Sequence, residues 1–430
     1  MSAHFGARRK TLLPLAGILC VLALGAAHAQ TFQVIHNFTG GLDGAEPTSG
    51  LTFDSAGSLY GTTFEGDALT GTVYKLIHKS SSWVLSPLYL FTKGGSGGAI
   101  PYSRVILGKD NTLYGTTGFG GSSQNCPGGC GVVFNLKPTP TPPTTPLTPW
   151  IETPLYRFNG GNDGANPYGG DLLFDQAGNL YGTAYNGGSG SCPGGCGIVY
   201  KLTPSGGSWT ESIVYVFQQT GGDGQHPWAG VIFDAAGNLY GTTVNGGAYG
   251  YGAIYELTPS GSGWTETILY SFTSGTDGAN PYAGVIFDQE GNLYGATGVG
   301  GSGGGGTVFE LSPSGTGWTF NLIYSFTGAG GQFVPGPIAS LVFNNAGNLY
   351  GTTHGDGAYN AGSAFKLTPG SGTWTLISLH DFTGGTDGAA PRSNLVFDKN
   401  GNMYGTAAGG GSGDPDKCDG SCGVIFEVTP

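Results

Sequence analysis

Charged residues are scarce in this sequence, and basic residues are the scarcest. Only 10% of the 430 residues are charged, with 15 Lys and Arg against 27 Asp and Glu. Three basic residues and no acidic ones precede position 30, which leaves 12 basic against 27 acidic residues and a formal charge of −15. An acidic chain without a basic cluster repels nucleic acid and anionic lipid. We therefore expect neither as a partner.

Helical periodicity is also missing from the main part of the chain. The apolar run Leu12–Leu24 follows the basic Arg8–Lys10 and precedes Ala27–Ala29, a small-x-small pattern typical of a cleavage site. The run is too short for a retained membrane helix. We expect residues 1–29 to be a signal peptide. Residues 30–430 should form one exported domain, periplasmic or secreted, with no integral membrane segment after cleavage.

Glycine is abundant, and it recurs in register with aromatic residues. The chain holds 86 glycines and 12% aromatics, and it repeats Leu-Tyr-Gly-Thr, or a near copy, seven times. The tyrosines of these copies are Tyr60, Tyr114, Tyr181, Tyr240, Tyr294, Tyr350 and Tyr404. A period of this size, made of short strand-like runs, is typical of repeat architectures that close or stack.

One copy shows the elements of the repeat. Gly284–Phe287 is a short apolar run, and a turn with an Asp-x-x-Gly-Asn pattern separates it from Leu293–Thr297. A glycine-rich loop leads to Thr307–Leu311, and a Pro/Gly turn leads to Trp318–Phe326. Four strands in about 55 residues are typical of one β-propeller blade. We label them a, b, c and d from the channel outward.

The two ends of the repeat region complement each other. Thr31–Phe38 is a lone d-like strand, and Asn394–Val428 supplies strands a, b and c. The sequence therefore predicts an all-β, seven-bladed β-propeller of four-stranded antiparallel blades, whose ring is closed when the N-terminal strand joins the C-terminal blade. A β-solenoid, the alternative, would have much shorter coils. Tyr-Gly in strand b is interpreted as packing between blades, and Asp-x-x-Gly-Asn as turn chemistry.

Three longer phrases of the repeat resemble a known family. They are Phe-Asp-x-x-Gly-Asn-Leu-Tyr-Gly-Thr-Thr, Gly-x-Val-Tyr-Lys-Leu-Thr-Pro and Leu-Tyr-Ser-Phe-Thr-Gly-Gly-x-Asp-Gly-Ala-Asn-Pro, and together they cover nearly all of residues 31–430. The chain resembles the GloVer-type tandem repeat of exported bacterial proteins with a choice of C-terminal anchor. The resemblance implies an exported propeller, and it brings no established activity and no catalytic residues. The anchor that often follows such repeats is missing here, so we expect a soluble exported protein.

Six cysteines form three local pairs in the loops between strands b and c. The pairs are Cys126 with Cys130, Cys192 with Cys196, and Cys418 with Cys422. An even number of paired cysteines in an exported chain predicts three disulfides. A four-thiolate zinc site on the neighbouring blades 2 and 3 is the alternative.

Catalytic and metal-binding motifs are absent or uninformative. Gly94–Gly98 and Gly300–Gly304 match Gly-x-Ser-x-Gly, but neither lies between a strand and a helix, as a nucleophile elbow requires. Asp414, Asp416 and Asp419 miss the spacing of a calcium loop. We expect no catalytic residue, no metal site and no cofactor. A calcium ion held by channel carboxylates is the alternative.

The loop from strand d to strand a of the next blade carries the most suggestive residues. An aspartate occurs in five copies of this loop, at Asp43, Asp163, Asp223, Asp277 and Asp387. An asparagine follows in two copies, at Asn166 and Asn280. A proline comes next, and in four copies an aromatic residue follows it, at Tyr102, Tyr168, Trp228 and Tyr282. Carboxylates and flat rings at a channel mouth suit a polyhydroxylated ligand or a cation. The structural interpretation, in which Asp-Gly forms the turn and the ring packs on the adjacent blade, is favoured because repetition from blade to blade is typical of a structural motif.

These observations predict a non-catalytic binding or interaction module. Its partner would be an unidentified glycan, or a protein of the envelope or extracellular space, bound at the channel-mouth face. The first alternative is an extracellular carbohydrate-active hydrolase or lyase with two channel carboxylates as acid and base. The second is a structural component of the envelope or matrix.

Overall fold

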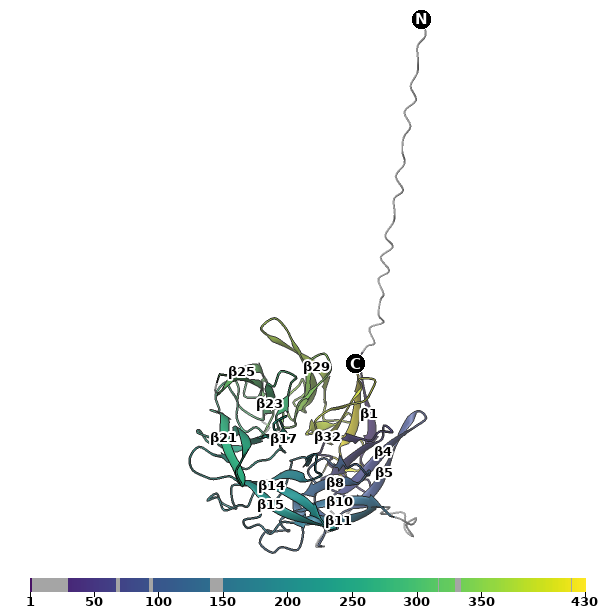
Figure 1. Ribbon diagram of the computed structural model, residues 1–430. Coiled ribbons are helices and arrows are strands. Elements are labelled where there is room, and N and C mark those ends of the chain that lie inside the picture. The colour runs from purple at the N-terminus through teal and green to yellow at the C-terminus, as the bar shows by residue number, and fades with distance from the viewer. Residues whose placement is uncertain are drawn as a thin grey trace.

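The computed structural model is an all-β ring of seven four-stranded antiparallel sheets (Figure 1). It describes residues 1, 30–66, 70–92, 96–139, 150–315, 317–328, 334–418 and 420–430. The predicted signal peptide lies outside the described residues apart from Met1. Each sheet is one blade of the predicted seven-bladed propeller, so the fold class is confirmed.

Every blade consists of a two-residue strand a, a strand b that contains the Leu-Tyr-Gly-Thr phrase, and longer strands c and d. Blade 1 comprises β2 (Thr52–Phe53), β3 (Leu59–Thr63), β4 (Thr72–Lys79) and β5 (Ser82–Leu90). Blade 2 comprises β7 (Ile106–Leu107), β8 (Leu113–Thr117), β10 (Val132–Pro138) and β11 (Trp150–Arg157). Blade 3 comprises β12 (Leu173–Phe174), β13 (Leu180–Ala184), β14 (Ile198–Ser205) and β15 (Ser208–Val216). Blade 4 comprises β17 (Ile232–Phe233), β18 (Leu239–Thr243), β20 (Ala253–Ser260) and β21 (Gly263–Ser271).

The remaining blades follow the same order. Blade 5 comprises β22 (Ile286–Phe287), β23 (Leu293–Thr297), β24 (Thr307–Ser314) and β25 (Gly317–Ser325). Blade 6 comprises β26 (Val342–Phe343), β27 (Leu349–Thr353), β28 (Ser363–Pro369) and β29 (Trp374–Asp381). Blade 7 comprises β31 (Val396–Phe397), β32 (Met403–Gly409), β33 (Val424–Thr429) and β1 (Thr31–Asn37), with β30 (Ala389–Pro391) also on β32. Two short ribbons in the loops pair β6 (Gly98–Ala99) with β9 (Phe119–Gly120) and β16 (Gly224–Gln225) with β19 (Asn245–Gly246).

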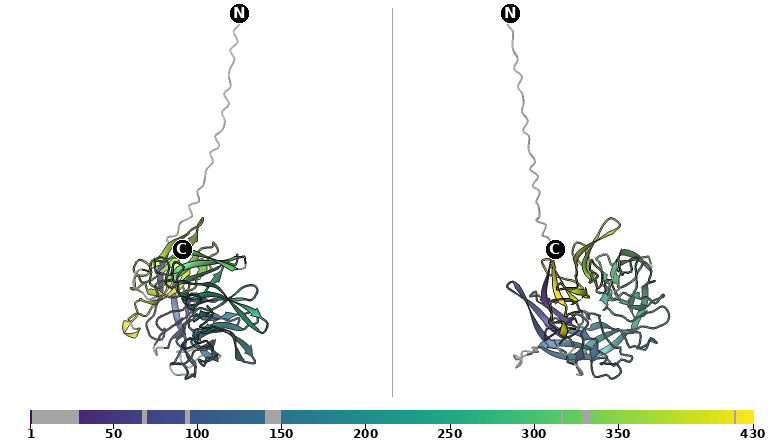
Figure 2. Two further views of the ribbon diagram at one scale, coloured as in Figure 1. Left: turned by 90° about the vertical axis from the view of Figure 1, so that its left-hand side faces the viewer. Right: turned by 180° about the vertical axis from the view of Figure 1, so that it is seen from behind.

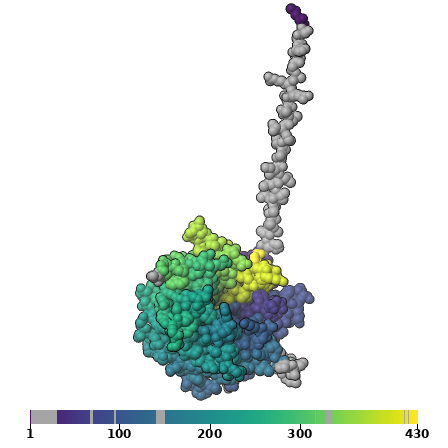
Figure 3. All heavy atoms as spheres, in the orientation of Figure 1, coloured from purple at the N-terminus to yellow at the C-terminus, as the bar shows by residue number. Residues whose placement is uncertain are grey.

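The N-terminal strand closes the ring, as the sequence predicts. β1 pairs antiparallel with β33 from Thr31 opposite Thr429 to Asn37 opposite Val424. The N-terminal strand and the C-terminal strand therefore lie in one sheet, and the purple β1 runs beside the yellow strands in Figure 1 and in the right-hand view of Figure 2. In the space-filling view the first and last blades form one continuous surface (Figure 3). Closure removes the unpaired edge that β33 would otherwise expose.

The repeated tyrosine packs between blades. In six seams its ring meets, edge to face, the phenylalanine of strand a in the following blade, with centroids 5.0 to 5.4 Å apart. One of these pairs, Tyr404 with Phe53, joins blade 7 to blade 1. Such pairs add stability beyond the area they bury. The phrase therefore binds each blade to the next rather than stabilising one blade alone.

The glycine and the threonine of the phrase have equally specific roles. A Cβ atom at Gly182 would lie 2.4 Å from the Tyr200 hydroxyl oxygen, so strand c can place its aromatic ring there only over glycine. The threonine hydroxyl donates to a carbonyl of the next blade in six seams, as Thr406 does to Ser49 across the closure at 2.9 Å. Blade 5 lacks this bond because Ala296 stands at that position.

The Asp-x-x-Gly-Asn segments are turns. Asp234 accepts hydrogen bonds from the amides of Ala236 and Asn238 and from the Asn238 side chain, all within 2.9 Å. The remaining elements are minor. The one helical turn of the described chain is a 3₁₀ turn at Pro415–Lys417. Within the described ranges, no helix has both the length and the apolar character needed to cross a membrane.

Candidate functional site at the channel mouth

A cavity of about 460 Å³ lies on the axis of the ring. All seven blades contribute to it, chiefly through the residues that follow the proline of each d-to-a loop. Among its lining residues are Thr48, Tyr102, Asp171, Trp228, Tyr282, Ile338 and Arg392, one from each loop. The volume is within the range of roughly 300–1,000 Å³ that is usual for small-molecule sites.

Aromatic rings form one side of the cavity. Trp228 lies with its ring centroid 5.3 Å from Tyr168, 5.7 Å from Tyr282 and 6.1 Å from Tyr102. Tyr102, Trp228 and Tyr282 line the cavity, and Tyr168 packs between Tyr102 and Trp228 behind them. The backbone approaches the indole closely at Gly169, where a Cβ atom would lie 2.3 Å from Nε1. The four aromatic residues predicted from the sequence thus form one contiguous cluster, which we call the aromatic wall.

The other side of the cavity is formed by Val334, Ile338, His354 and Arg392. The His354 Nδ1 atom lies 3.0 Å from the Val334 carbonyl oxygen, to which it donates as the protonated ring nitrogen. Burial and the nearby Arg392 charge lower the pKa of His354 to about 4, so the ring is neutral at physiological pH. Arg392 is exposed to the cavity. We call this part of the lining the cationic side.

Polar contacts between neighbouring blades also line the cavity, at the residues just before strand a. Arg104 holds Asp171 through Nε at 2.9 Å and Nη2 at 2.8 Å, and its amide adds a third contact to the same carboxylate. Across the ring, Ser340 Oγ accepts a hydrogen bond from the amide of Gly284 at 3.1 Å. Because the carboxylate of Asp171 is paired with a guanidinium, the two charges offset each other.

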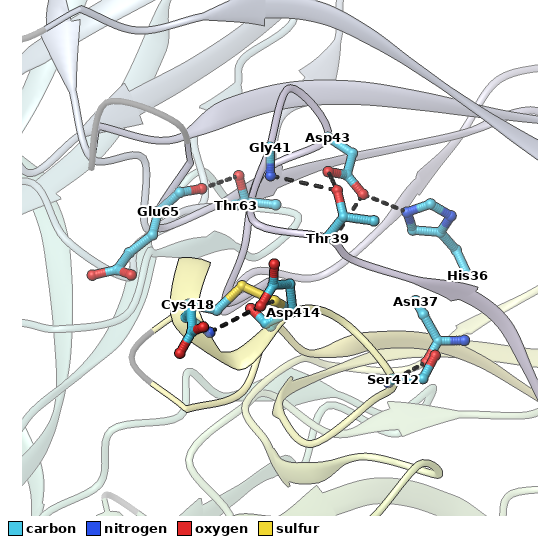
Figure 4. Close-up of a disulfide and its surroundings, with 12 residues drawn as sticks. His36, Asn37, Thr39, Gly41, Asp43, Thr63, Glu65, Ser412, Asp414 and Cys418 are labelled. Atoms are coloured by element: carbon cyan, nitrogen blue, oxygen red, sulfur yellow. Dashed lines mark hydrogen bonds and ion pairs between the residues drawn. A yellow bond between two sulfur atoms is a disulfide. The ribbon is translucent and has the colours of Figure 1, made fainter.

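The five repeated aspartates lie in the loops above the cavity, but they are not among its lining residues. Each carboxylate accepts hydrogen bonds from its own loop and from the preceding strand d. Asp277, for example, binds the Thr273 amide at 2.8 Å and the Tyr270 hydroxyl at 3.1 Å. Asp43 points toward Thr39 and His36 in the same way (Figure 4). Asp163, Asp223 and Asp387 make equivalent contacts.

Electrostatics distinguish these aspartates from one another. Although burial opposes ionisation, hydrogen bonds from His36 and Thr39 lower the pKa of Asp43. In Asp223 burial dominates and raises the pKa. Its neighbour across the seam is Glu266, whose pKa rises to about 8 through burial and the Asp223 charge. Glu211 similarly reaches about 7 through burial and the charge of Asp163. Carboxyls with raised pKa values therefore lie in the outer seams and outside the lining of the cavity.

Asn166 and Asn280 link neighbouring blades. The Asn166 side-chain amide donates to the Gly118 carbonyl, and that of Asn280 donates to the Val244 carbonyl. The residue before the proline has a positive φ of 51° to 60° in six loops, and asparagine tolerates this conformation best among residues with a side chain. In the structure both asparagines serve the loop backbone. Ligand binding by them, and by the aspartates, stays a prediction.

All three predicted disulfides are formed: Cys126–Cys130, Cys192–Cys196 and Cys418–Cys422. The four-thiolate zinc alternative is therefore not formed, and the described residues contain no cluster of three or more His, Cys, Asp or Glu that could hold a metal ion. The second cysteine of each pair accepts a backbone hydrogen bond from the next blade's loop. Cys130 receives the Asn166 amide and Cys196 the His226 amide, at 2.7 and 2.8 Å. Two disulfides thus support the loops that carry Tyr168 and Trp228.

Sequence reasoning missed the polar residues of the cavity. Arg104, Asp171, Ser340 and Asn394 stand where blades 4 and 5 have Gly230 and Gly284, just before strand a. Arg392 occupies the position of the aromatic residues. The available signal was this departure from the repeat at positions that converge on the axis.

The comparisons with known proteins agree with the repeat and the fold. A sequence model of the Gloeobacter/Verrucomicrobia repeat matches residues 24–192 and 189–416, which is most of the chain. The chain belongs to the Gloeobacter/Verrucomicrobia repeat family. No curated protein is significantly similar to this family member in sequence.

Solved structures resemble this Gloeobacter/Verrucomicrobia repeat protein in fold alone. A putative 6-phosphogluconolactonase from Bacteroides uniformis is 15% identical, with 81% of this chain and 88% of that chain covered and a TM-score of 0.51. A putative oxidoreductase (glucose dehydrogenase) from Thermus thermophilus is 14% identical, with 93% and 100% covered and a TM-score of 0.43. A polysaccharide lyase, an ulvan lyase, is 10% identical, with 81% and 86% covered and a TM-score of 0.46.

Proposed function

We propose that this protein is an exported, non-catalytic binding module, and that a polyhydroxylated ligand such as a glycan occupies the axial cavity. The observation that carries the proposal is the aromatic wall. Three half-buried rings from different blades, Tyr102, Trp228 and Tyr282, face one cavity of ligand size. Sugar rings stack their apolar C–H faces on such surfaces, while their hydroxyls need polar partners.

The remaining lining supplies those polar partners. Ser340 and Asn394 each bring hydrogen-bonding groups to the cavity, and the tyrosine hydroxyls add more. Burial raises the pKa of Tyr102 to about 12 and raises that of Tyr282 as well, so both hydroxyls stay protonated donors at physiological pH. The combination of an apolar face and directional polar groups suits a ring that bears several hydroxyls.

The contents of the cavity support binding over a reaction in which two channel carboxylates act as acid and base. A carbohydrate-active enzyme of the expected type needs two carboxyls near the scissile bond. Among the described lining residues, Asp171 alone carries a carboxylate, and Arg104 engages it on both oxygens. The imidazole of His354, with a pKa of about 4, is a weak base at neutral pH.

Export is supported by the three disulfides, which persist in oxidising compartments. The compartment after export, periplasmic or extracellular, is tested by fractionating the producing cells. Recovery of the protein with free thiols from the cytoplasm would contradict the proposal.

Binding is tested with a glycan array, followed by titration of the tightest oligosaccharide into the protein and into Trp228→Ala. Loss of the stacking surface should weaken binding by about 1–3 kcal/mol, or roughly 5- to 150-fold. Tyr249→Ala is the matched control, because Tyr249 is an exposed aromatic residue in a b-to-c loop outside the cavity lining. Equal losses in both variants, or turnover of the oligosaccharide by the wild type, would contradict a non-catalytic site at the cavity.

A further inference from the structure

Arg392 is the one cation of the cavity that has no counter-ion among the described residues. Arg104 is paired with Asp171, and Arg157, on the outer strand β11, donates to the Ser96 carbonyl. Arg392 belongs to none of the ion pairs of the described chain, and it is exposed to the cavity. The Arg392 guanidinium is therefore the unpaired positive group of the described cavity lining. It offers two parallel N–H donors to an anion.

The position of Arg392 places it opposite the aromatic wall. Arg392 follows the proline of the loop that enters blade 7, and Trp228 follows that of the loop that enters blade 4. Blades 4 and 7 lie on opposite sides of a seven-membered ring. A sugar ring stacked on Trp228 therefore directs its far edge toward the cationic side of the cavity.

The surroundings keep Arg392 the dominant charge on that side. His354 is neutral, because burial and the guanidinium together lower its pKa to about 4. Arg392 also acts on the Tyr102 hydroxyl. Burial raises the pKa of Tyr102, and the positive charge of Arg392 partly offsets that rise. Glu46, in the loop that enters blade 1, acts on Tyr102 in the other direction. Glu46 does not line the cavity, so its charge reduces the positive potential in the cavity without taking up space there.

We propose that the ligand is an acidic saccharide, and that Arg392 binds its carboxylate or sulfate group while the sugar ring stacks on Trp228 and Tyr282. This inference rests on the proposed function, since it names the ligand class of the same cavity. Both anions present coplanar or clustered oxygens to a guanidinium, which is the shared chemistry that the site recognises. In a chain with a formal net charge of −12, the attraction is local to the cavity.

The test compares three short oligosaccharides on the purified protein: an oligogalacturonate, its carboxyl-reduced neutral counterpart, and a sulfated galactan oligosaccharide. Calorimetry gives the affinity, and the change in tryptophan fluorescence that is lost in Trp228→Ala reports occupancy of the cavity, since the chain has seven tryptophans. At least one acidic ligand should bind 10-fold or more tightly than the neutral one, and added salt should reduce this preference. The ratio of the affinities for the two acidic ligands shows whether the site prefers a carboxylate or a sulfate group.

Single-residue variants then test whether Arg392 is the side chain that binds the anionic group. Arg392→Gln should weaken the acidic ligand by about 10- to 100-fold and leave the neutral ligand within twofold, which erases the discrimination. Arg392→Lys should restore part of it, and Glu46→Gln should tighten the acidic ligand. Lys109→Gln, which removes an exposed positive charge from the opposite-face turn between β7 and β8, should change neither affinity.

The outcomes separate this inference from the proposed function. If the neutral and acidic ligands bind equally, with affinity lost in Trp228→Ala and kept in Arg392→Gln, the acidic class is wrong and the glycan site stands. If none of the three oligosaccharides alters the tryptophan fluorescence of the protein or produces a heat of binding, the acidic-saccharide assignment is overturned. A broader glycan array that also finds no ligand would overturn the proposed function with it.

Discussion

The two sides of the axial cavity are built from the same repeat, yet their chemistry differs. Loops that enter blades 2 to 5 present Tyr102, Tyr168, Trp228 and Tyr282 after the proline. Loops that enter blades 6, 7 and 1 present Ile338, Arg392 and Thr48 at the equivalent position. The residue before the proline has a positive φ in six of these loops, on both sides of the cavity, so the contrast lies mainly in the side chains.

This difference shows where a repeat protein can carry specificity. Residues present in nearly every blade, such as the loop aspartates and the Leu-Tyr-Gly-Thr phrase, make hydrogen bonds and ring contacts that hold the ring together. Residues that break the pattern, such as Arg392 and Asp171, face the axis. The aromatic wall is intermediate, because it is repeated in four loops and also faces the cavity.

The largest effect is expected from removing the strand that completes blade 7. Deletion of residues 30–38 removes β1 from blade 7, the blade whose entry loop carries Arg392, and leaves β33 as an unpaired edge. We expect loss of cooperative unfolding, or aggregation, in calorimetry and light scattering. An unchanged melting curve for the truncated protein would show that closure by β1 contributes nothing to the ring.

A smaller effect, dependent on pH, is expected in the outer seam between blades 3 and 4. Glu266 faces Asp223, which lies in the loop that carries Trp228, and its pKa is about 8 in the folded protein against an ordinary value of 4.5. The folded state therefore binds this proton more tightly than the unfolded state does. The stabilisation is complete below pH 4.5 and is lost as the pH rises through 8.

Glu266→Gln should remove this dependence, because an amide stays neutral. Relative to the variant, the wild type should lose on the order of 1–2 kcal/mol of unfolding free energy between pH 5 and pH 9, a value discounted for solvent screening. Denaturant unfolding at both pH values measures it. Glu290→Gln, in an exposed turn, is the control. If the unfolding free energies of the wild type and Glu266→Gln change in parallel with pH, Glu266 does not hold a proton in the folded protein.

The smallest effect is expected at Asp277, where a substitution distinguishes a role in stabilising the loop from a role in binding the ligand. Asp277→Asn keeps an acceptor for the turn but weakens charge-assisted bonds to the Thr273 amide and the Tyr270 hydroxyl. We expect a loss of about 1 kcal/mol in stability, measured by denaturant unfolding, and unchanged ligand affinity. Weakened binding at full stability would instead restore the carboxylates as ligand-binding groups.

The sequence predicted the fold well because the repeat expresses it seven times. Each copy carries its own strands and turns, and the orphan Thr31–Phe38 segment has only one free partner, the strand before the C-terminus. The disulfides were equally accessible, since each pair of cysteines is separated by three residues in one loop.

The site was only partly predictable. The aromatic residues were found because they recur after proline, and the structure brings them together. The remaining residues of the site each depart from the repeat at one position; they are Arg392, His354 and the Arg104–Asp171 pair. No pattern in the sequence around them indicates that they lie close together. Their proximity arises from the ring, which places residues hundreds of positions apart around one axis. The direction of the aspartate side chains, into their own loops, likewise depends on the three-dimensional turn.

The most direct test of the central claim is a crystal structure of the protein with its tightest-binding oligosaccharide. The account predicts a sugar ring in the axial cavity, stacked on Trp228, with its polar edge toward Arg392. A ligand bound instead on the opposite-face turns or on the outer strands, with the cavity free of sugar, would contradict it.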